Sequence, residues 1–186
     1  MGTRGCVGWT VDGKNYIETY NHFDSYVDGL GCAMLEAIKV MDLKKLQDNL
    51  STITEIDNGE KIASKSMQKK YKKYSSNPNG LEEQKFTWYW LLRELQGVKN
   101  LIEIEKGNVS HVITNNGWLN DSLFCEYGYT LNFKTNVLEF WRGFQKDSKT
   151  DKYIRCKKVG KIPFSVVKKT SIDNLVTMAK KFYKEK

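Results

Sequence analysis

The sequence lacks the motifs that mark the common classes of enzyme. It has no P-loop, no dinucleotide-binding fingerprint, no HExxH zinc motif and no nucleophile elbow. Histidine is scarce, and His22 and His111 are too few for a histidine-rich metal centre. We therefore expect no cofactor and no metal site, and we predict a protein that is not an enzyme.

Clustered cysteines and long apolar runs are also missing. The four cysteines, Cys6, Cys32, Cys125 and Cys156, are widely spaced and form no CxxC pair. This spacing is typical of reduced, mostly buried thiols and does not indicate a disulfide scaffold or a zinc site. No apolar run approaches the length of a membrane span, and the N-terminal stretch lacks the basic-then-apolar pattern of a signal peptide. These absences predict a cytoplasmic protein that does not contact membranes.

Positive charge is abundant and unevenly placed. The chain has 30 Lys and Arg against 22 Asp and Glu, a net charge of +8, and a pI of about 9.2. From Trp141 to Lys186 there are 14 Lys and Arg against 4 Asp and Glu, so the rest of the chain is close to neutral. A basic excess favours acidic partners such as nucleic acid.

Hydrophobic patterning predicts one α+β domain over residues 1–186. The glycine-rich stretch Gly2–Gly31 contains two alternating runs joined by Asp12-Gly13, which favours a hairpin that feeds a polar loop. Ser122–Gly143 predicts a second hairpin that turns at residues 134–136. Helices are expected at 32–41, 42–50, 61–74, 81–97 and from Ser171 onward, with extended segments at 153–159 and 162–167. We expect a mostly antiparallel sheet packed against the aromatic helix 81–97 and the C-terminal helix.

Residues 51–80 contain the densest basic cluster, and we interpret them as a basic insertion or a mobile segment. The cluster consists of Lys65, Lys69, Lys70, Tyr71, Lys72, Lys73 and Tyr74. Its lysines could form a solvated helix face. Alternatively, they neutralise phosphates while a tyrosine stacks on a base or sugar. Because the cluster has no arginine, bidentate recognition of bases is not expected.

A second basic group lies in the last quarter of the chain. Its predicted partner-binding residues are Lys152, Arg155, Lys157, Lys158 and Lys161, within a basic segment that extends to Lys169. The run at residues 153–159 is predicted as an edge strand, where lysines discourage edge-to-edge pairing. Both basic groups are expected to bind DNA, RNA or a nucleoprotein in a salt-sensitive manner.

Two further sets of residues have competing interpretations. Cys6, His22 and Asp24 could compose the nucleophilic set of a small cysteine hydrolase of the amidase type. The alternative is a structural role, in which Arg4, Asp24 and Asp28 form a polar network. Glu126 is either a buried acid with a raised pKa or a salt-bridged sheet residue.

Several motifs resemble those of small proteins from bacteriophages and mobile elements. They are Met1-Gly2-Thr3-Arg4, Asp12-Gly13, Phe23-Asp24-Ser25-Tyr26 with Gly29 and Gly31, Ser122–Tyr129, Leu138, Trp141-Arg142-Gly143, and Ser171–Leu175. The resemblance covers both ends and the middle of the chain but not residues 43–80. His22-Phe23 stands where such relatives commonly have Gln-Trp.

This resemblance implies an accessory protein that acts in the host bacterial cytoplasm. A basic member without enzyme motifs is similar in outline to anti-CRISPR proteins that inhibit a host defence nuclease, such as Cas9 with its guide RNA. A chain of net charge +8 cannot imitate DNA, so it would grip nucleic acid or dock on an acidic protein surface. The alternatives are the cysteine hydrolase and a structural phage protein that forms a homodimer.

Overall fold

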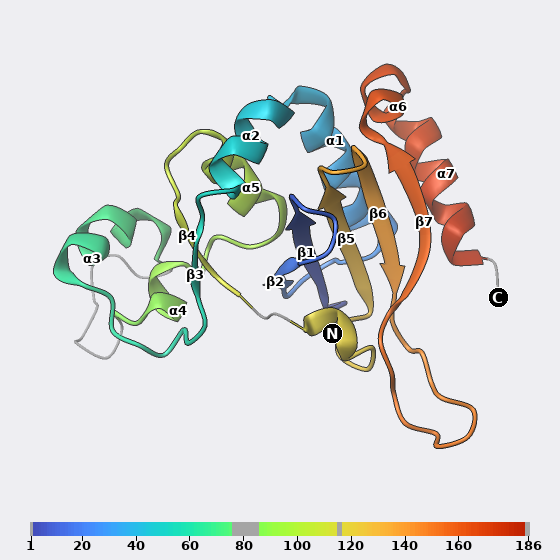
Figure 1. Ribbon diagram of the computed structural model, residues 1–186, viewed down its shortest axis with the longest axis horizontal. Helices are drawn as coiled ribbons and strands as arrows, with labels where there is room; N and C mark the ends of the chain where they lie inside the picture. Colours follow the sequence, from blue (N-terminus) through green and yellow to red (C-terminus); the bar gives the residue numbers. More distant parts are fainter. Residues whose placement is uncertain (1, 76–85, 115–116, 185–186) are drawn as a thin grey trace.

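A five-stranded mixed sheet forms the centre of the computed structural model, which describes residues 2–75, 86–114 and 117–184 (Figure 1). The strands are β1 (Gly5–Thr10), β2 (Ile17–Asn21), β5 (Tyr127–Asn132), β6 (Val137–Arg142) and β7 (Lys157–Pro163), in the spatial order β2-β1-β5-β6-β7. Within this sheet, β1 and β5 pair in parallel and the other neighbouring strands pair antiparallel. The prediction of an α+β domain with a mostly antiparallel sheet is therefore confirmed.

Both predicted hairpins are present, and local chemistry explains the first turn. The Asp12 carboxylate accepts hydrogen bonds from the backbone N–H groups of Lys14 and Asn15, at 2.8 and 2.9 Å. These bonds hold the pKa of Asp12 well below its usual range. Gly13 has φ of +79°, a conformation that costs glycine little. The β1–β2 hairpin is thus specified by the Asp-Gly pair, as the sequence predicts.

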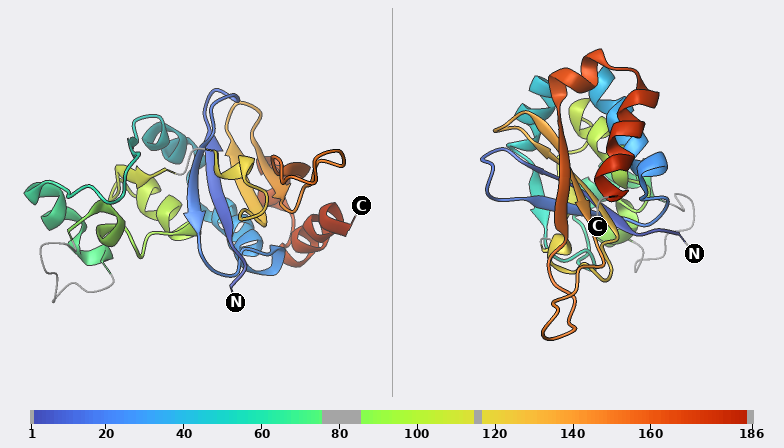
Figure 2. Two further views of the ribbon diagram at one scale, coloured as in Figure 1. Left: turned by 90° about the horizontal axis from the view of Figure 1, so that it is seen from below. Right: turned by 90° about the vertical axis from the view of Figure 1, so that its right-hand side faces the viewer.

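Helices cover one face of the sheet. They are η1 (Val27–Gly31), which continues into α1 (Cys32–Val40), then α2 (Leu43–Leu50), α5 (Gly97–Glu105), α6 (Phe164–Lys169) and α7 (Ile172–Lys184). Figure 2 shows α1 and α7 side by side against this face. Trp9, Tyr129 and Phe140 project from the strands and are fully buried with Met34 and Leu35 of α1. This face contains most of the hydrophobic core.

Residues 52–75, 86–96 and 108–114 form a lateral extension, seen at the left of Figure 1. It contains the parallel pair β3 (Thr54–Ile56) and β4 (His111–Ile113), together with α3 (Lys65–Tyr71), η2 (Lys72–Tyr74) and α4 (Trp88–Leu91). The predicted basic segment 51–80 is therefore folded as far as residue 75, and residues 76–80 lie outside the described part of the chain.

The predicted helix over residues 81–97 is wrong. Only Trp88–Leu91 is helical, residues 81–85 lie outside the described residues, and Gly97 begins α5 where the prediction ends a helix. Gly97 has φ of +56°, and a Cβ there would lie 2.8 Å from Oδ1 of Asn21 on β2. The chain turns where it packs against the sheet, a tertiary contact that helical periodicity does not reveal.

Two boundaries also differ from the predictions. The segment 162–167 is extended only at Ile162 and Pro163, because β7 ends at Pro163 and α6 begins at Phe164, whose buried ring packs on Phe133. The second hairpin begins at Tyr127, since the chain before it makes turns. In the part of the chain that the structure describes, no helix has the length and apolar character needed to cross a membrane.

The other face of the sheet has a thinner cover. A small apolar cluster joins Cys6, Leu119, Cys125, Trp141 and Cys156 under the short turn η4 (Trp118–Asn120). Gly128 allows this cover to approach, because a Cβ there would lie 2.9 Å from Leu119 Cδ2. Beside the cluster, the same face becomes polar.

Candidate partner-binding site

The polar part of the second face is centred on Glu139 of β6. The strand register places Glu139 of β6 opposite Thr130 of β5, and Thr130 opposite Gly8 of β1. Across these three strands the face therefore carries one carboxylate and one hydroxyl, and the glycine adds no side chain. Glu139 is only 3% exposed. A carboxylate this deeply buried needs hydrogen-bond donors.

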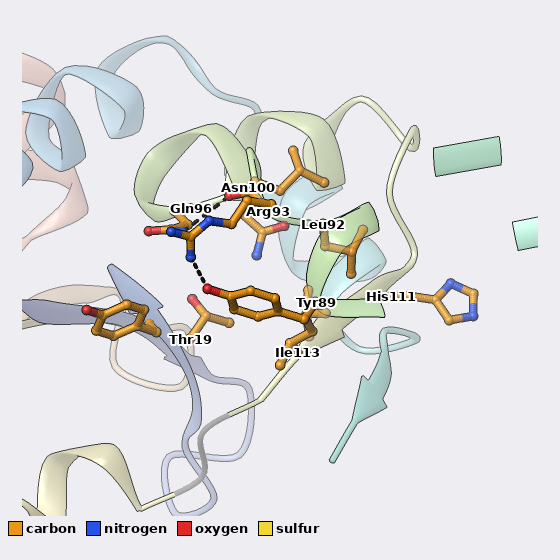
Figure 3. A pocket seen from close by; sticks show the side chains of 11 residues that line it. Thr19, Tyr89, Leu92, Arg93, Gln96, Asn100, His111 and Ile113 are labelled. Atoms are coloured by element: carbon orange, nitrogen blue, oxygen red, sulfur yellow. Dashed lines mark hydrogen bonds between the residues drawn. The ribbon is translucent and has the colours of Figure 1, made fainter. Parts of the chain in front are cut away.

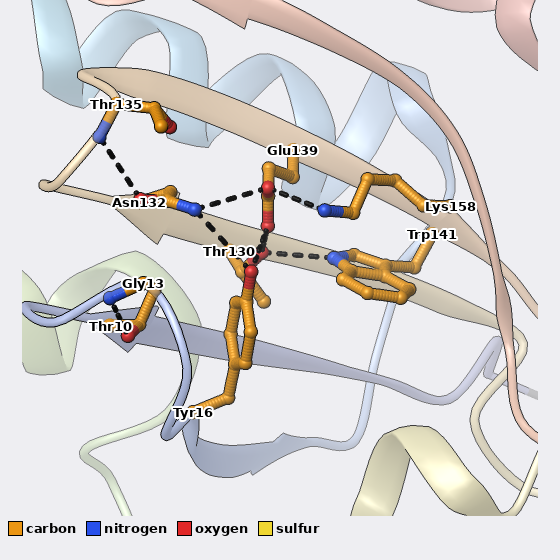
Figure 4. Close-up of polar contacts among 9 residues, drawn as sticks. All are labelled: Thr10, Gly13, Tyr16, Thr130, Asn132, Thr135, Glu139, Trp141 and Lys158. Atoms are coloured by element: carbon orange, nitrogen blue, oxygen red, sulfur yellow. Dashed lines mark hydrogen bonds and ion pairs between the residues drawn. The ribbon is translucent and has the colours of Figure 1, made fainter.

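Four side chains supply those donors (Figure 4). Tyr16 Oη and Thr130 Oγ1 donate to Oε2 of Glu139 at 2.8 and 2.9 Å. Lys158 Nζ and Asn132 Nδ2 donate to Oε1 at 2.6 and 3.3 Å. The network fixes groups from β5, β6, β7 and the β1–β2 hairpin in one arrangement.

Electrostatics follow from these contacts. Burial alone would raise the pKa of Glu139, but the hydrogen bonds from Lys158, Tyr16 and Thr130 outweigh it and hold the pKa below the usual value. Burial and the hydrogen bond to Glu139 raise the pKa of Tyr16 to about 12. At neutral pH the network therefore contains an ionised carboxylate and a neutral phenol.

A hollow of about 480 Å³ lies beside the network. Tyr16, Asn132 and Glu139 line it with Thr135, Lys158 and Lys161. Lys134 lies next to Gly13, which also lines the hollow, since a Cβ on Gly13 would lie 2.8 Å from Lys134 Cδ. The hollow thus combines hydrogen-bonding groups in its wall with exposed ammonium groups at its edge.

A β-bulge brings Lys158 and Lys161 to the same face. Phe140 pairs with Gly160 but Trp141 pairs with Lys158, so Val159 is an extra residue in β7. Without the bulge, two positions three apart in a strand would point to opposite faces. The irregularity directs both ammonium groups toward the hollow.

Of the remaining residues of the second predicted basic group, Arg155 packs on Trp141 of the same face. Arg155 donates to Asn120 Oδ1 at 2.8 Å, and its guanidinium carbon is 5.4 Å from the Trp141 ring centroid. Lys158 Nζ lies 4.9 Å from the same centroid. Lys152 and Lys157 are exposed. The structure therefore gathers Arg155, Lys158 and Lys161 on one side of the sheet.

The first predicted basic group lies at the opposite end of the molecule, in the extension (Figure 1). Its lysines, Lys65, Lys69, Lys70, Lys72 and Lys73, are exposed. Tyr71 and Tyr74 are 0% and 6% exposed, and their hydroxyls bond to Ser110 and Glu103. Because the rings pack in the core of the extension, the stacking role predicted for these tyrosines does not fit their placement.

The candidate nucleophilic residues are not assembled. Cys6 is 0% exposed, and its Sγ lies 3.7 Å from Sγ of Cys125 inside the small apolar cluster. His22 bonds through Nδ1 to Tyr20, while Asp24 is exposed with φ of +48°. Among the described residues, no hydrogen bond joins Cys6, His22 and Asp24 to one another. No group of His, Cys, Asp and Glu in the described ranges is arranged to hold a metal ion.

Glu126 follows the salt-bridged interpretation. Its Oε1 accepts a hydrogen bond from the Arg4 backbone N–H at 3.1 Å and lies 3.8 Å from Arg4 Nε. The Arg4 guanidinium also stacks on Phe124, at 4.7 Å from the ring centroid. These contacts tie the start of the chain to the loop before β5.

Sequence reasoning missed most of the hollow. The overlooked members are Tyr16, Asn132, Lys134, Thr135 and Glu139. A signal existed in Val137-Leu138-Glu139-Phe140-Trp141, where one acid interrupts an otherwise apolar strand. Alternation along the two strands would also have placed Asn132 and Glu139 on the same face.

No protein-family model, curated protein or solved structure matches this chain. The resemblance to phage proteins therefore stays a prediction, and the functional argument depends on the site geometry.

Proposed function

We propose that the protein is a non-enzymatic binding protein. It would bind a polyanionic partner at the hollow lined by Glu139, Lys158 and Lys161, which we call the β7 hollow. The partner class expected from the resemblance is a host defence nuclease with its guide RNA. Inhibition would then result from occupying the nuclease or its nucleic acid, without any bond being made or broken by this chain.

One observation supports the proposal above the others. Lys158 and Lys161 line a hollow whose only carboxylate, among the described residues that line it, is already paired with Lys158, and Lys134 lies beside Gly13 of the same lining. Glu139 is held by four donors and repels an incoming anion less than a free carboxylate would. Lys134 and Lys161 make no ion pair with any described residue, so their charge is available to phosphates.

The type of recognition follows from the residues present. Lysine is a point charge on a flexible stem, which suits phosphate contacts more than bidentate reading of bases. The exposed Thr135 hydroxyl offers a hydrogen bond to a sugar or base edge that enters the hollow. Binding through this surface should therefore be salt-sensitive and largely independent of sequence.

A matched pair of charge reversals tests the proposal. Lys161→Glu changes the lining of the hollow, whereas Lys99→Glu makes the same change at an exposed position of α5. We expect Lys161→Glu to weaken binding of a labelled single-stranded RNA several-fold and to reduce the slope of log K against log salt by about 1. Lys99→Glu should leave both values unchanged. Lys158 is avoided because its removal would leave Glu139 with one fewer donor.

The same variants can be compared in a cleavage assay with an RNA-guided nuclease. Wild type and Lys99→Glu should inhibit cleavage equally, and Lys161→Glu should inhibit less. Equal RNA affinity of the two variants, or affinity that does not change with salt, would rule out the β7 hollow as the nucleic-acid site. Loss of binding only on reversal of Lys69 and Lys72 would move the site to the extension.

A further inference from the structure

A second, smaller cavity of about 60 Å³ lies where the extension meets the sheet (Figure 3). Leu92, Val112 and Ile113 give it apolar walls, and Arg93, Asn100 and Tyr20 contribute polar groups. Its lining comes from β2, α5 and the extension, and it is separate from the β7 hollow. Tyr89, 36% exposed, and the part-exposed Arg93 give a ligand access.

Asn100 is the most informative residue of this cavity. It is only 5% exposed, and its amide has no hydrogen-bond partner among the described residues, but it is not sealed from solvent as the unpaired indole N–H groups of Trp9 and Trp118 are. Buried side-chain amides almost always have partners, because desolvation without a hydrogen bond is unfavourable. The amide therefore faces a cavity in which a partner from outside the chain could be bound.

Arg93 gives the cavity its charge. Its guanidinium donates to Tyr89 Oη and lies 5.0 Å from the Tyr89 ring centroid, which holds it in place. His111, the other ionisable base in the lining, is favoured in its neutral form because burial, with help from Lys70, lowers its pKa. Among the described residues that line the cavity there is no Asp or Glu. The site is therefore complementary to a single negative charge.

We infer that this cavity binds a small organic acid. Arg93 and Asn100 would take the carboxylate, because a guanidinium fork and an amide N–H both match carboxylate oxygens. Leu92, Val112 and Ile113 would cover a short apolar chain. The cavity volume of about 60 Å³ is small, which favours a short monocarboxylate such as propionate.

Titration of the full chain with propionate, followed by two-dimensional NMR, tests the inference. Propionamide, which has the same shape without the charge, is the matched probe. We expect saturable shifts for cavity residues with propionate and binding at least about ten-fold weaker with propionamide, the factor that corresponds to 1.4 kcal/mol. Absence of saturable shifts with propionate, or equal binding of both probes, would overturn the assignment.

Variants then separate a binding role from a structural one. Asn100→Leu should abolish propionate binding without lowering the unfolding midpoint of the free protein, since an unpaired amide is replaced by an apolar group of similar size. Arg93→Gln should also weaken binding at least about ten-fold. Lys99→Gln, on the exposed side of α5, is the control and should bind as wild type does. Full binding by either cavity variant, or a lowered midpoint in Asn100→Leu, would contradict the inference.

Discussion

The two faces of the central sheet use different chemistry, and two adjacent residues of β6 display the contrast. Phe140 points to the helix-covered face, where it contacts Tyr129 and Phe182 with ring centroids 5.7 and 5.4 Å away. Glu139 points to the other face and is held by four hydrogen-bond donors. Both side chains are almost fully buried.

The two faces of the sheet differ in how strictly they constrain the identity of their residues. Apolar packing requires only residues of suitable volume, so many sequences could fill the helix-covered face. The polar network requires particular donors at particular positions, and it leaves a hollow lined by hydrogen-bonding groups. Stability should therefore depend mainly on the first face and binding mainly on the second.

The largest expected effect is on the apolar face. Phe140→Ala should lower the free energy of unfolding by about 3–5 kcal/mol, because a fully buried ring is replaced by a cavity between β6 and α7. Urea unfolding measures this change. Phe140→Leu keeps most of the volume and should cost less than about 1.5 kcal/mol. A loss below about 1 kcal/mol for the alanine variant would show that the face repacks freely.

An intermediate effect is expected on the polar face. Glu139→Ala should cost about 2 kcal/mol at neutral pH, because Thr130 and Asn132 lose their acceptor while the part-exposed Lys158 regains water. Glu139→Gln keeps one acceptor oxygen and should cost less. Urea unfolding of both variants gives the comparison.

The contribution of Glu139 to the free energy of unfolding should also depend on pH. Its pKa is lower in the folded protein than in the unfolded chain, so its contribution is present above the unfolded pKa and is lost as pH falls through the folded pKa. The stability gap between wild type and Glu139→Gln should therefore narrow in acid, below the ordinary carboxyl pKa. If the difference in stability between wild type and Glu139→Gln stayed constant below the ordinary carboxyl pKa, the network would not be stabilising the ionised form of Glu139.

Elements defined by local signals could be predicted from the sequence. Asp12-Gly13 specifies the first turn, and Asp42 caps α2 by accepting from the N–H groups of Lys44 and Lys45. The amphipathic stripe of α7 also follows from its periodicity. Each of these signals acts within a few residues of the element that it specifies.

The candidate site could not be predicted in the same way. Its residues come from four strands or turns, and Lys158 joins Lys161 only because Val159 forms a bulge. The buried position of Tyr71 likewise depends on contacts with Trp88 and His111 across the extension. Charge counts and periodicity do not report long-range packing of this kind. The sequence therefore identifies Lys158 and Lys161 as candidates but does not identify the residues that surround them.

The smallest expected effect comes from Glu18, the second buried acid of the polar face. It lies in the same row of the sheet, is 3% exposed, and accepts a hydrogen bond from the Leu119 N–H at 2.9 Å. Burial raises its pKa, opposite to the shift of Glu139, although its backbone partners and the positive charge of Arg155 reduce the rise. Through its bond to the Leu119 N–H, the Glu18 carboxyl group caps η4.

Glu18→Gln should accordingly respond to pH in the sense opposite to Glu139→Gln. A group whose folded pKa is raised contributes stability below the unfolded pKa and loses it as pH rises through the folded pKa. Relative to wild type, Glu18→Gln should become more favourable between acid and neutral pH, by less than about 1 kcal/mol in urea unfolding. If both glutamine variants shifted with the same sign, the two acids would share one environment, and the division of this face into a paired carboxylate beside the hollow and a structural cap beneath η4 would be wrong.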